Sequence, residues 1–136
     1  MSALRREMMD TMEKNVGIYR TEEGLQEGVS KIHELRQRYR RVILTDKSSV
    51  FNTDLFQVLE LGSMLDCAEA VTVGALARKE SRGAHQRLDY VERDDKTFLR
   101  HTMVHHQGLD APRVDYLDVV ITKSPPGVRD YSGDHK

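Results

Sequence analysis

Apolar residues in the first third of the chain recur at the spacing of an α-helix. Residues 3–14 carry one such stripe, and Gly17, which tolerates a positive φ, is placed to end that helix. A second helix is predicted after Thr21, because its hydroxyl can cap the helix and the acidic residues that follow suit the positive end of the helix dipole. The first stripe is Leu4, Met8 and Met12, and the second is Leu25, Val29, Ile32, Leu35 or Arg36, and Tyr39.

A third and longer helix is predicted from residue 52 or 53 to about residue 81. Its apolar residues cover most of its circumference, so we expect it to be the buried central element. Cys67, in the middle of this helix, is interpreted as a small hydrophobic core residue. Residues 42–44 are predicted to form a short extended bridge before it. Three antiparallel helices are the simplest packing of these segments.

The last third of the chain changes to the alternating pattern of β-strands, over residues 98–104 and 114–121. The connection over residues 105–112 contains Gly108 and suits a hairpin loop. A lone two-stranded hairpin is marginally stable in water, so it must rest on the helices or on something outside the chain. The sequence thus predicts a mainly α fold in one domain: an antiparallel three-helix bundle over residues 1–83, then an extended segment, a C-terminal β-hairpin and a tail over residues 84–136.

Composition narrows the classes of protein to which the chain can belong. A net charge of −1 with interspersed acids and bases argues against nucleic acid as a partner. The single cysteine excludes an internal disulfide. No apolar run approaches the roughly 20 residues that cross a bilayer, so we expect no direct membrane insertion. Because Met1 is followed by a charged helical pattern, no secretory leader is expected, and the chain is predicted to be a soluble domain from a reducing compartment.

Charge and imidazole are concentrated in residues 78–95, which we call the charged junction. His85, Arg87 and Asp89 fall at spacing two, so they share one face if the segment after Gly83 is extended. Such a face suits a general acid–base site or a carboxylate-binding cleft. The alternative is a paired network that fastens the helix to the hairpin, or this domain to a neighbour. The even alternation of acid and base favours the paired network.

Other candidate sites are weaker. His101, His105 and His106 suggest a metal site, but they are predicted to lie on a strand and its loop with no further ligand cluster, so no metal is expected. The chain has no Gly-x-Gly-x-x-Gly motif and hence no dinucleotide fingerprint. A small hydrolase built on His85 and Asp89 lacks a convincing nucleophile. The arginines over residues 36–41 are those that a helix dipole favours in a last turn.

The order of several short motifs resembles the C-terminal domain of the flavoprotein subunit of fumarate reductase and succinate dehydrogenase. The motifs are Met12, Val16-Gly-Ile-Tyr-Arg-Thr-Glu-Glu-Gly-Leu25, Phe51-Asn-Thr-Asp-Leu55, Glu60-Leu61, Arg78-Lys-Glu-Ser-Arg-Gly-Ala-His85, Arg87, Asp89, Arg93-Asp-Asp95, Leu99, His101-Thr102, Pro125-Pro126, Arg129 and Tyr131. The charged junction is shared in part with L-aspartate oxidases, whose C-terminal domain is an alternative. His85 with Arg87 resembles the fumarate reductase and succinate dehydrogenase branch, and the ending Tyr131-Ser-Gly133 leans towards fumarate reductase. Val91 and Phe98 depart from the usual proline and tryptophan of the family.

The resemblance implies that the parent protein interconverts fumarate and succinate by hydride transfer with FAD, which an upstream domain holds. The segments that supply the flavin motif and the catalytic arginine lie outside this sequence, so the chain is expected to be a fragment that neither binds a cofactor nor is catalytic by itself. Whether the parent acts mainly as reductase or dehydrogenase stays open. The expected location is cytoplasmic, peripheral to the inner face of the membrane through partner subunits.

We expect the charged junction to have a docking role. The predicted docking residues are Glu80, Arg82, His85, Arg87, Asp89 and Arg93. Their partners would be the FAD-binding domain of the same polypeptide and the iron–sulfur subunit, and the isolated fragment could self-associate through an exposed docking face. A second hypothesis is an independent helical adaptor that grips an acidic protein through residues 36–41.

Overall fold

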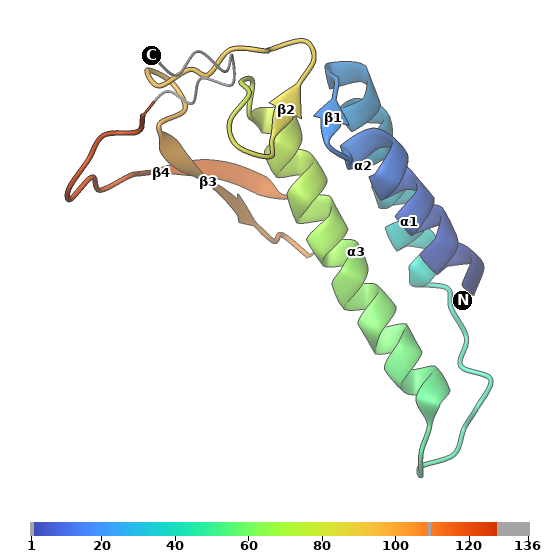
Figure 1. Cartoon of the computed structure of the whole chain (residues 1–136). Coiled ribbons are helices and arrows are strands. Elements are labelled where there is room, and N and C mark those ends of the chain that lie inside the picture. Colours follow the sequence, from blue (N-terminus) through green and yellow to red (C-terminus); the bar gives the residue numbers. More distant parts are fainter. Residues whose placement is uncertain (1, 109, 128–136) are drawn as a thin grey trace, which may run out of the picture.

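A computed structural model describes residues 2–108 and 110–127, and within them the chain is mainly α (Figure 1). The helices are α1 (Ser2–Val16), α2 (Glu22–Tyr39) and α3 (Thr53–Ala77), which pack side by side with alternating direction. This confirms the predicted three-helix bundle. The motif residues Arg129, Tyr131 and Gly133 lie outside the described residues. Over the described ranges, no helix combines the length and the apolar character needed to span a bilayer.

Side-chain caps begin two of the helices where the sequence predicts them. The Thr21 hydroxyl accepts the amide of Gly24 at 3.1 Å, and the Asn52 side chain accepts that of Leu55 at 2.8 Å. The stripes of all three helices then meet in one core. Its buried members are Leu4, Met8, Ile32, Leu35, Leu61, Leu65 and Ala68, with a smaller cluster of Val16, Leu25 and Ala75 beside the charged junction.

α3 departs from its prediction in two ways. It ends at Ala77 rather than near residue 81, because Arg78 turns to an extended conformation (φ −92°, ψ 102°). Its N-terminal half is also covered on one side only by the described residues, since α1 and α2 lie against the face of Leu61, Leu65 and Ala68. Cys67 lies on the opposite side and is exposed, so its assignment to the core was wrong. When apolar residues cover most of the circumference of a helix, its sequence does not show which face has a neighbour.

The predicted hairpin is present as β3 (Arg100–His105) and β4 (Arg113–Asp118), paired antiparallel. It lies across the C-terminal half of α3, where the absent side chain of Gly74 makes room: a Cβ there would stand 3.3 Å from a methyl of Val104. The strands are displaced from the predicted ranges because residues 94–98 form a turn, in which the Phe98 amide bonds to the Asp94 carbonyl at 2.9 Å. Residues 42–44 form no strand and follow directly on the turn that ends α2, in which the Val42 amide bonds to the Tyr39 carbonyl at 3.0 Å.

A parallel pair of two-residue strands, absent from the predictions, joins the α1–α2 connection to the segment after α3. β1 (Tyr19–Arg20) follows α1, and β2 (Gln86–Arg87) lies in the charged junction, with Arg20 opposite Arg87. Gly83 has the positive φ expected of it (+59°), but it lies in a turn between Arg82 and His85 rather than at the end of the helix. Only a short part of the segment is therefore extended as predicted.

Candidate functional site

The charged junction lies at one end of the bundle. The α1–α2 connection, the last turn of α3, β2 and the start of the hairpin meet there (Figure 1). In these elements the side chains of Glu80 and Arg87 are fully buried. Burying a charged side chain is costly unless it is paired and hydrogen-bonded, so the partners of these two residues determine what the junction can do.

Arg87 is the centre of the first half of the junction. Its Nε and Nη2 donate to the two carboxylate oxygens of Asp89, both at 2.8 Å, in a bidentate pair. Nη2 also donates to Glu22 of α2 at 2.9 Å. Nη1 faces the carbonyl oxygens that end α3, at 3.3–3.4 Å from Ala75, Leu76 and Arg78. One guanidinium therefore closes the C-terminus of α3, where a cation is favoured by the helix dipole, and ties it to the start of α2.

Asp89 binds the start of α2 through the backbone. Its Oδ2 accepts the backbone amide of Glu22 at 2.8 Å, the first residue of α2. The hydrogen bond from Arg87 is the main reason that the pKa of Asp89 falls to about 2. Because the folded pKa lies below the unfolded one, the pair stabilises the fold at neutral pH and loses this contribution only as the pH falls below 4 towards 2.

Glu80 is the centre of the second half. Oε1 accepts hydrogen bonds from Arg78 and Arg82, each at 2.8 Å, and Oε2 accepts from Arg82 at 3.0 Å and from the Asp94 amide at 2.8 Å. Burial alone would raise the pKa of Glu80, but the hydrogen bonds from Arg82, the Asp94 amide and Arg78 outweigh it and hold the pKa below its ordinary value. The carboxylate is thus ionised and fully engaged.

Arg78 connects Glu80 to the hairpin. Its guanidinium donates to the hydroxyl of Thr102 at 2.8 Å and to the carbonyls of Phe98 and Arg100, and it lies 5.6 Å from the centre of the Phe98 ring. The hairpin is therefore fastened to the end of α3 by polar contacts as well as by its packing near Gly74.

Both ring nitrogens of His85 are used in holding the backbone. Arg20 donates to Nδ1 at 2.7 Å, so this nitrogen is the acceptor, and Nε2 therefore carries the proton that it donates to the Arg78 carbonyl at 3.0 Å. Burial lowers the pKa of His85 below its ordinary 6.5, and the guanidinium groups of Arg20, Arg87 and Arg78 act in the same direction, against the hydrogen bond to the carbonyl. The imidazole is neutral and has no nitrogen free to move a substrate proton.

This geometry predicts an acid-sensitive stability. Below about pH 6.5 the unfolded chain binds a proton at His85 that the folded chain does not, so the free energy of unfolding falls as the pH drops from 7.5 to 5.5. His85→Gln, which keeps an amide donor but does not titrate, is expected to flatten that slope in urea unfolding measured at both pH values. His33→Gln, at an exposed position on α2, should leave the slope as it is. An unchanged slope in the His85 variant would contradict the assignment.

The outer rim of the junction surrounds a groove of about 1,170 Å³. Arg82 and Arg93 both donate to Asp95, at 2.6 and 2.8 Å, and Arg93 also donates to the Gly127 carbonyl at 2.7 Å. These three side chains remain partly exposed and line the groove together with residues of the 81–86 and 91–96 turns. The groove is thus a polar surface with both signs of charge.

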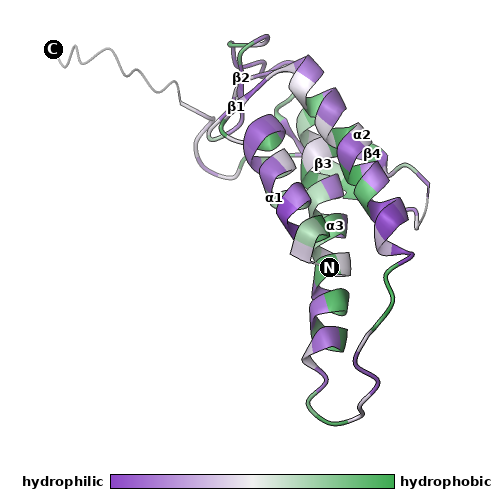
Figure 2. Cartoon of the chain, turned by 90° about the vertical axis from the view of Figure 1, so that its right-hand side faces the viewer, coloured by the Kyte–Doolittle hydropathy of each residue, from purple (hydrophilic) through white to green (hydrophobic). Residues whose placement is uncertain are grey.

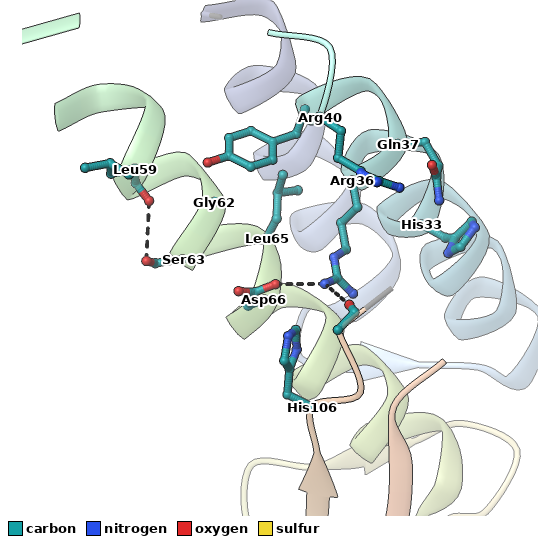
Figure 3. A pocket seen from close by; sticks show the side chains of 12 residues that line it. His33, Arg36, Gln37, Arg40, Leu59, Gly62, Ser63, Leu65, Asp66 and His106 are labelled. Atoms are coloured by element: carbon teal, nitrogen blue, oxygen red, sulfur yellow. Dashed lines mark hydrogen bonds and ion pairs between the residues drawn. The ribbon is translucent and has the colours of Figure 1, made fainter. Parts of the chain in front are cut away.

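A second hollow of about 420 Å³ lies between α2, α3 and the hairpin loop (Figure 3). Arg36 crosses it and is engaged by Asp66 at 3.1 Å, by Glu69, and by the Gly108 carbonyl at 2.8 Å. Arg38 is paired with Glu7 and Glu34. Two of the arginines at the end of α2 are therefore neutralised within the chain.

The structure brings the predicted junction residues together but distributes them differently. Arg87 and Glu80 are internal, His85 and Asp89 are partly covered, and Arg82 and Arg93 face the groove. Their docking role stays a prediction. Sequence reasoning missed Arg20 and Glu22, which lie 65 residues from the junction partners they contact. In the described part of the chain no three His, Cys, Asp or Glu side chains gather as metal ligands, and no glycine-rich strand-to-helix turn fits a dinucleotide such as FAD.

Comparison with known proteins gives consistent matches over almost the whole chain. Residues 5–131 match the family model described as fumarate reductase flavoprotein C-term. The fumarate reductase flavoprotein subunit of Haemophilus influenzae is 50% identical over 133 residues, which cover 98% of this chain and 22% of that protein. The succinate dehydrogenase flavoprotein subunit of Rickettsia bellii is 41% identical, covering 88% and 20%.

Solved structures agree with these matches. The FrdA chain of Escherichia coli quinol fumarate reductase superposes with a TM-score of 0.93 at 50% identity, covering 98% of this chain and 23% of that one. The chain thus spans about a fifth of the length of the relatives that it matches.

Proposed function

The chain belongs to the family of fumarate reductase and succinate dehydrogenase flavoprotein C-terminal domains, and from this premise we propose that it serves as the docking domain of a longer flavoprotein. The parent would interconvert fumarate and succinate by hydride transfer with FAD held elsewhere in the polypeptide. Its other proposed partner is the iron–sulfur subunit, which would keep the protein peripheral to the cytoplasmic face of the membrane. The isolated chain would not be catalytic.

One observation supports this proposal above the others: the chemically capable residues of the junction are occupied by one another. His85 has both nitrogens engaged, and the carboxylates of Glu80 and Asp89 accept hydrogen bonds from arginines and backbone amides. General acid–base catalysis needs a group within reach of a substrate proton and free to exchange it. A paired network of this kind instead fixes the relative positions of helices and hairpin, which suits a domain that presents a rigid surface.

The polar groove is the proposed contact with the FAD-binding domain. Arg82 and Arg93 expose part of their guanidinium groups to it, whereas the buried carboxylate of Glu80 holds Arg82 from inside. Rim charges of this kind mainly set the register and rate of an association, and each typically contributes a modest part of its free energy.

The test uses Arg93→Ala in the full-length flavoprotein. FAD retained per polypeptide after gel filtration is expected to fall about two- to fivefold, as about 0.5 to 1 kcal/mol of contact energy implies. The Michaelis constant for fumarate should not change. Arg113→Ala, which removes an exposed arginine of β4 that pairs only locally with Asp115, is the matched control and should retain FAD fully. A higher Michaelis constant with full FAD retention would overturn the docking role.

The adaptor hypothesis has less support. It relies on the arginines over residues 36–41, and Arg36 and Arg38 already satisfy carboxylates of α1, α2 and α3. A stand-alone adaptor would appear in a cell extract as a flavin-free band at 15.6 kDa with antibody against this domain. A larger band that carries flavin fluorescence would favour the flavoprotein.

A further inference from the structure

A mostly apolar strip of α3 points away from the bundle and is not covered by the residues that the structure describes. Its side chains recur every three or four positions, so they lie on one face of the helix. The members are Phe56, Leu59, Ser63, Cys67 and Val71, and the exposed fractions of the three large ones are 70%, 57% and 49%. Together with Val50 and Phe51 in the loop before α3, we call these residues the bare face. Figure 2 shows hydrophobic residues on the lower turns of α3 and at the tip of that loop.

The bare face continues a surface that the hairpin already covers. Gly74 lies seven residues after Cys67, on the same side of α3, and there Val104 and Thr102 of β3 rest on the helix. The hairpin ends before it reaches Leu59, and the hollow between α2, α3 and the hairpin loop opens beside Leu59 and Ser63 (Figure 3). A helix that is apolar on most of its circumference is normally buried throughout. The N-terminal half of α3 therefore requires a neighbour that the described residues of this chain do not supply.

The loop before α3 presents an aromatic side chain at a backbone cost. Phe51 has φ +52°, a region that bulky side chains rarely adopt, and its side chain is 92% exposed. Hydrogen bonds, rather than flexibility of the loop, account for this conformation. Asn52 donates to the carbonyls of Asp46 and Ser48, both at 3.0 Å, and Asp54 accepts the amide of Thr45 at 2.9 Å. A strained residue held outward by a hydrogen-bonded frame indicates a contact that compensates for the strain.

We propose that the rest of the flavoprotein polypeptide packs against the bare face, and that Phe51 inserts into an apolar pocket of that polypeptide. This inference rests on the proposed function and adds to it a second contact, apolar and separate from the polar groove. The matched relatives devote more than three quarters of their length to other segments, which is ample chain to cover the strip. The five members on α3 carry no charge, so they suit an apolar protein surface. Near the tip, the two carboxylates of Asp46 and Asp54 outnumber the single cation of Lys47, which disfavours an anionic lipid surface.

The experiment replaces the matching segment of the Haemophilus influenzae subunit with this chain, since the two are 50% identical. The variants are Phe51→Asn, whose side chain tolerates a positive φ, and the double variant Phe56→Ser with Leu59→Ser. In the chimera each is expected to speed the release of FAD on mild heating at least tenfold. In the 136-residue chain alone, Phe51→Asn should leave the thermal midpoint equal or raise it, because it relieves the strain. Val120→Ser, at an exposed apolar position after β4, is the matched control.

The outcomes separate the two proposals. If the Phe51 and Phe56/Leu59 variants release FAD no faster than Val120→Ser while Arg93→Ala still loses FAD, the bare face has no docking role and the groove alone is the contact. Self-association of the unaltered chain, abolished by Phe51→Asn with the chimera unaffected, would assign the face to a second copy and overturn the inference. Failure of the unaltered chimera to hold FAD would overturn the proposed function and this inference with it.

Discussion

Arg87→Met is expected to destabilise the chain by about 3 to 5 kcal/mol, because it leaves buried and partly buried charges without their partner. Glu22 and Asp89 would face each other without the guanidinium, and three carbonyl oxygens at the end of α3 would each lose one donor, although that of Arg78 would keep its bond from His85. Domains of this size are stable by about 5 to 15 kcal/mol, so the loss is a large fraction of the total. Urea unfolding at pH 7, followed by far-UV circular dichroism, measures it.

Two further variants show whether the geometry of the guanidinium matters. Arg87→Lys keeps the charge but has neither the fork that binds Asp89 nor the reach to three carbonyls, so it should recover less than half of the loss. Arg113→Met removes a comparable side chain from an exposed pair and should cost less than about 1 kcal/mol. If Arg87→Met cost no more than Arg113→Met, the junction would not hold α2 and α3 together as the structure indicates.

Glu80→Gln is expected to have the second largest effect, about 3 kcal/mol, although the two side chains have nearly the same shape. The amide would turn a donor towards Arg78 or Arg82, and both guanidinium groups would lose their buried counter-ion. Because Arg78 also holds Phe98, Arg100 and Thr102, the loss should be concentrated in the hairpin.

Hydrogen exchange of backbone amides distinguishes this local effect from a general one. In Glu80→Gln the amides of β3 should lose protection before those of α1 and α2 do. Asp115→Asn, which neutralises an exposed carboxylate of β4, should leave all protection factors as they are. Equal loss in every element of the Glu80 variant would argue against the fastening role assigned to Arg78.

Local signals in the sequence were enough to predict the bundle. The cap at Thr21, the start of a helix at residue 52 or 53 and the apolar stripes act over three or four residues, and the structure has them as predicted. The hairpin was predicted for the same reason, although its strands are displaced by the turn that Asp94 and Phe98 form. Features that depend on contacts between elements could not be predicted from the sequence. Cys67 is exposed because no element in the described part of the chain covers that side of α3, and apolar composition does not show this.

The candidate site, too, could be predicted only in part. That acids and bases in the charged junction pair with one another followed from their alternation, and the bonds from Arg87 to Asp89 and from Arg82 to Glu80 agree with it. The alternation did not predict which of these charged side chains are buried. The burial of Arg87 requires Glu22 and the end of α3, and those elements come together through the packing of α2 on α3 and the pairing of β1 with β2. Pairing across 65 residues leaves no periodic trace in a sequence.

The parallel pair of β1 and β2 also sets an order of events when the chain folds. Contacts distant in sequence carry a loop-closure cost that local contacts do not, so helical segments and their turns form before such a pair. During synthesis, α1 and α2 leave the ribosome well before Arg87, and until it arrives the acidic start of α2 lacks its counter-ion. The first two helices should therefore remain a loose, exchanging pair until the charged junction has been synthesised. Closing the junction would be the step that commits the nascent domain to its final shape.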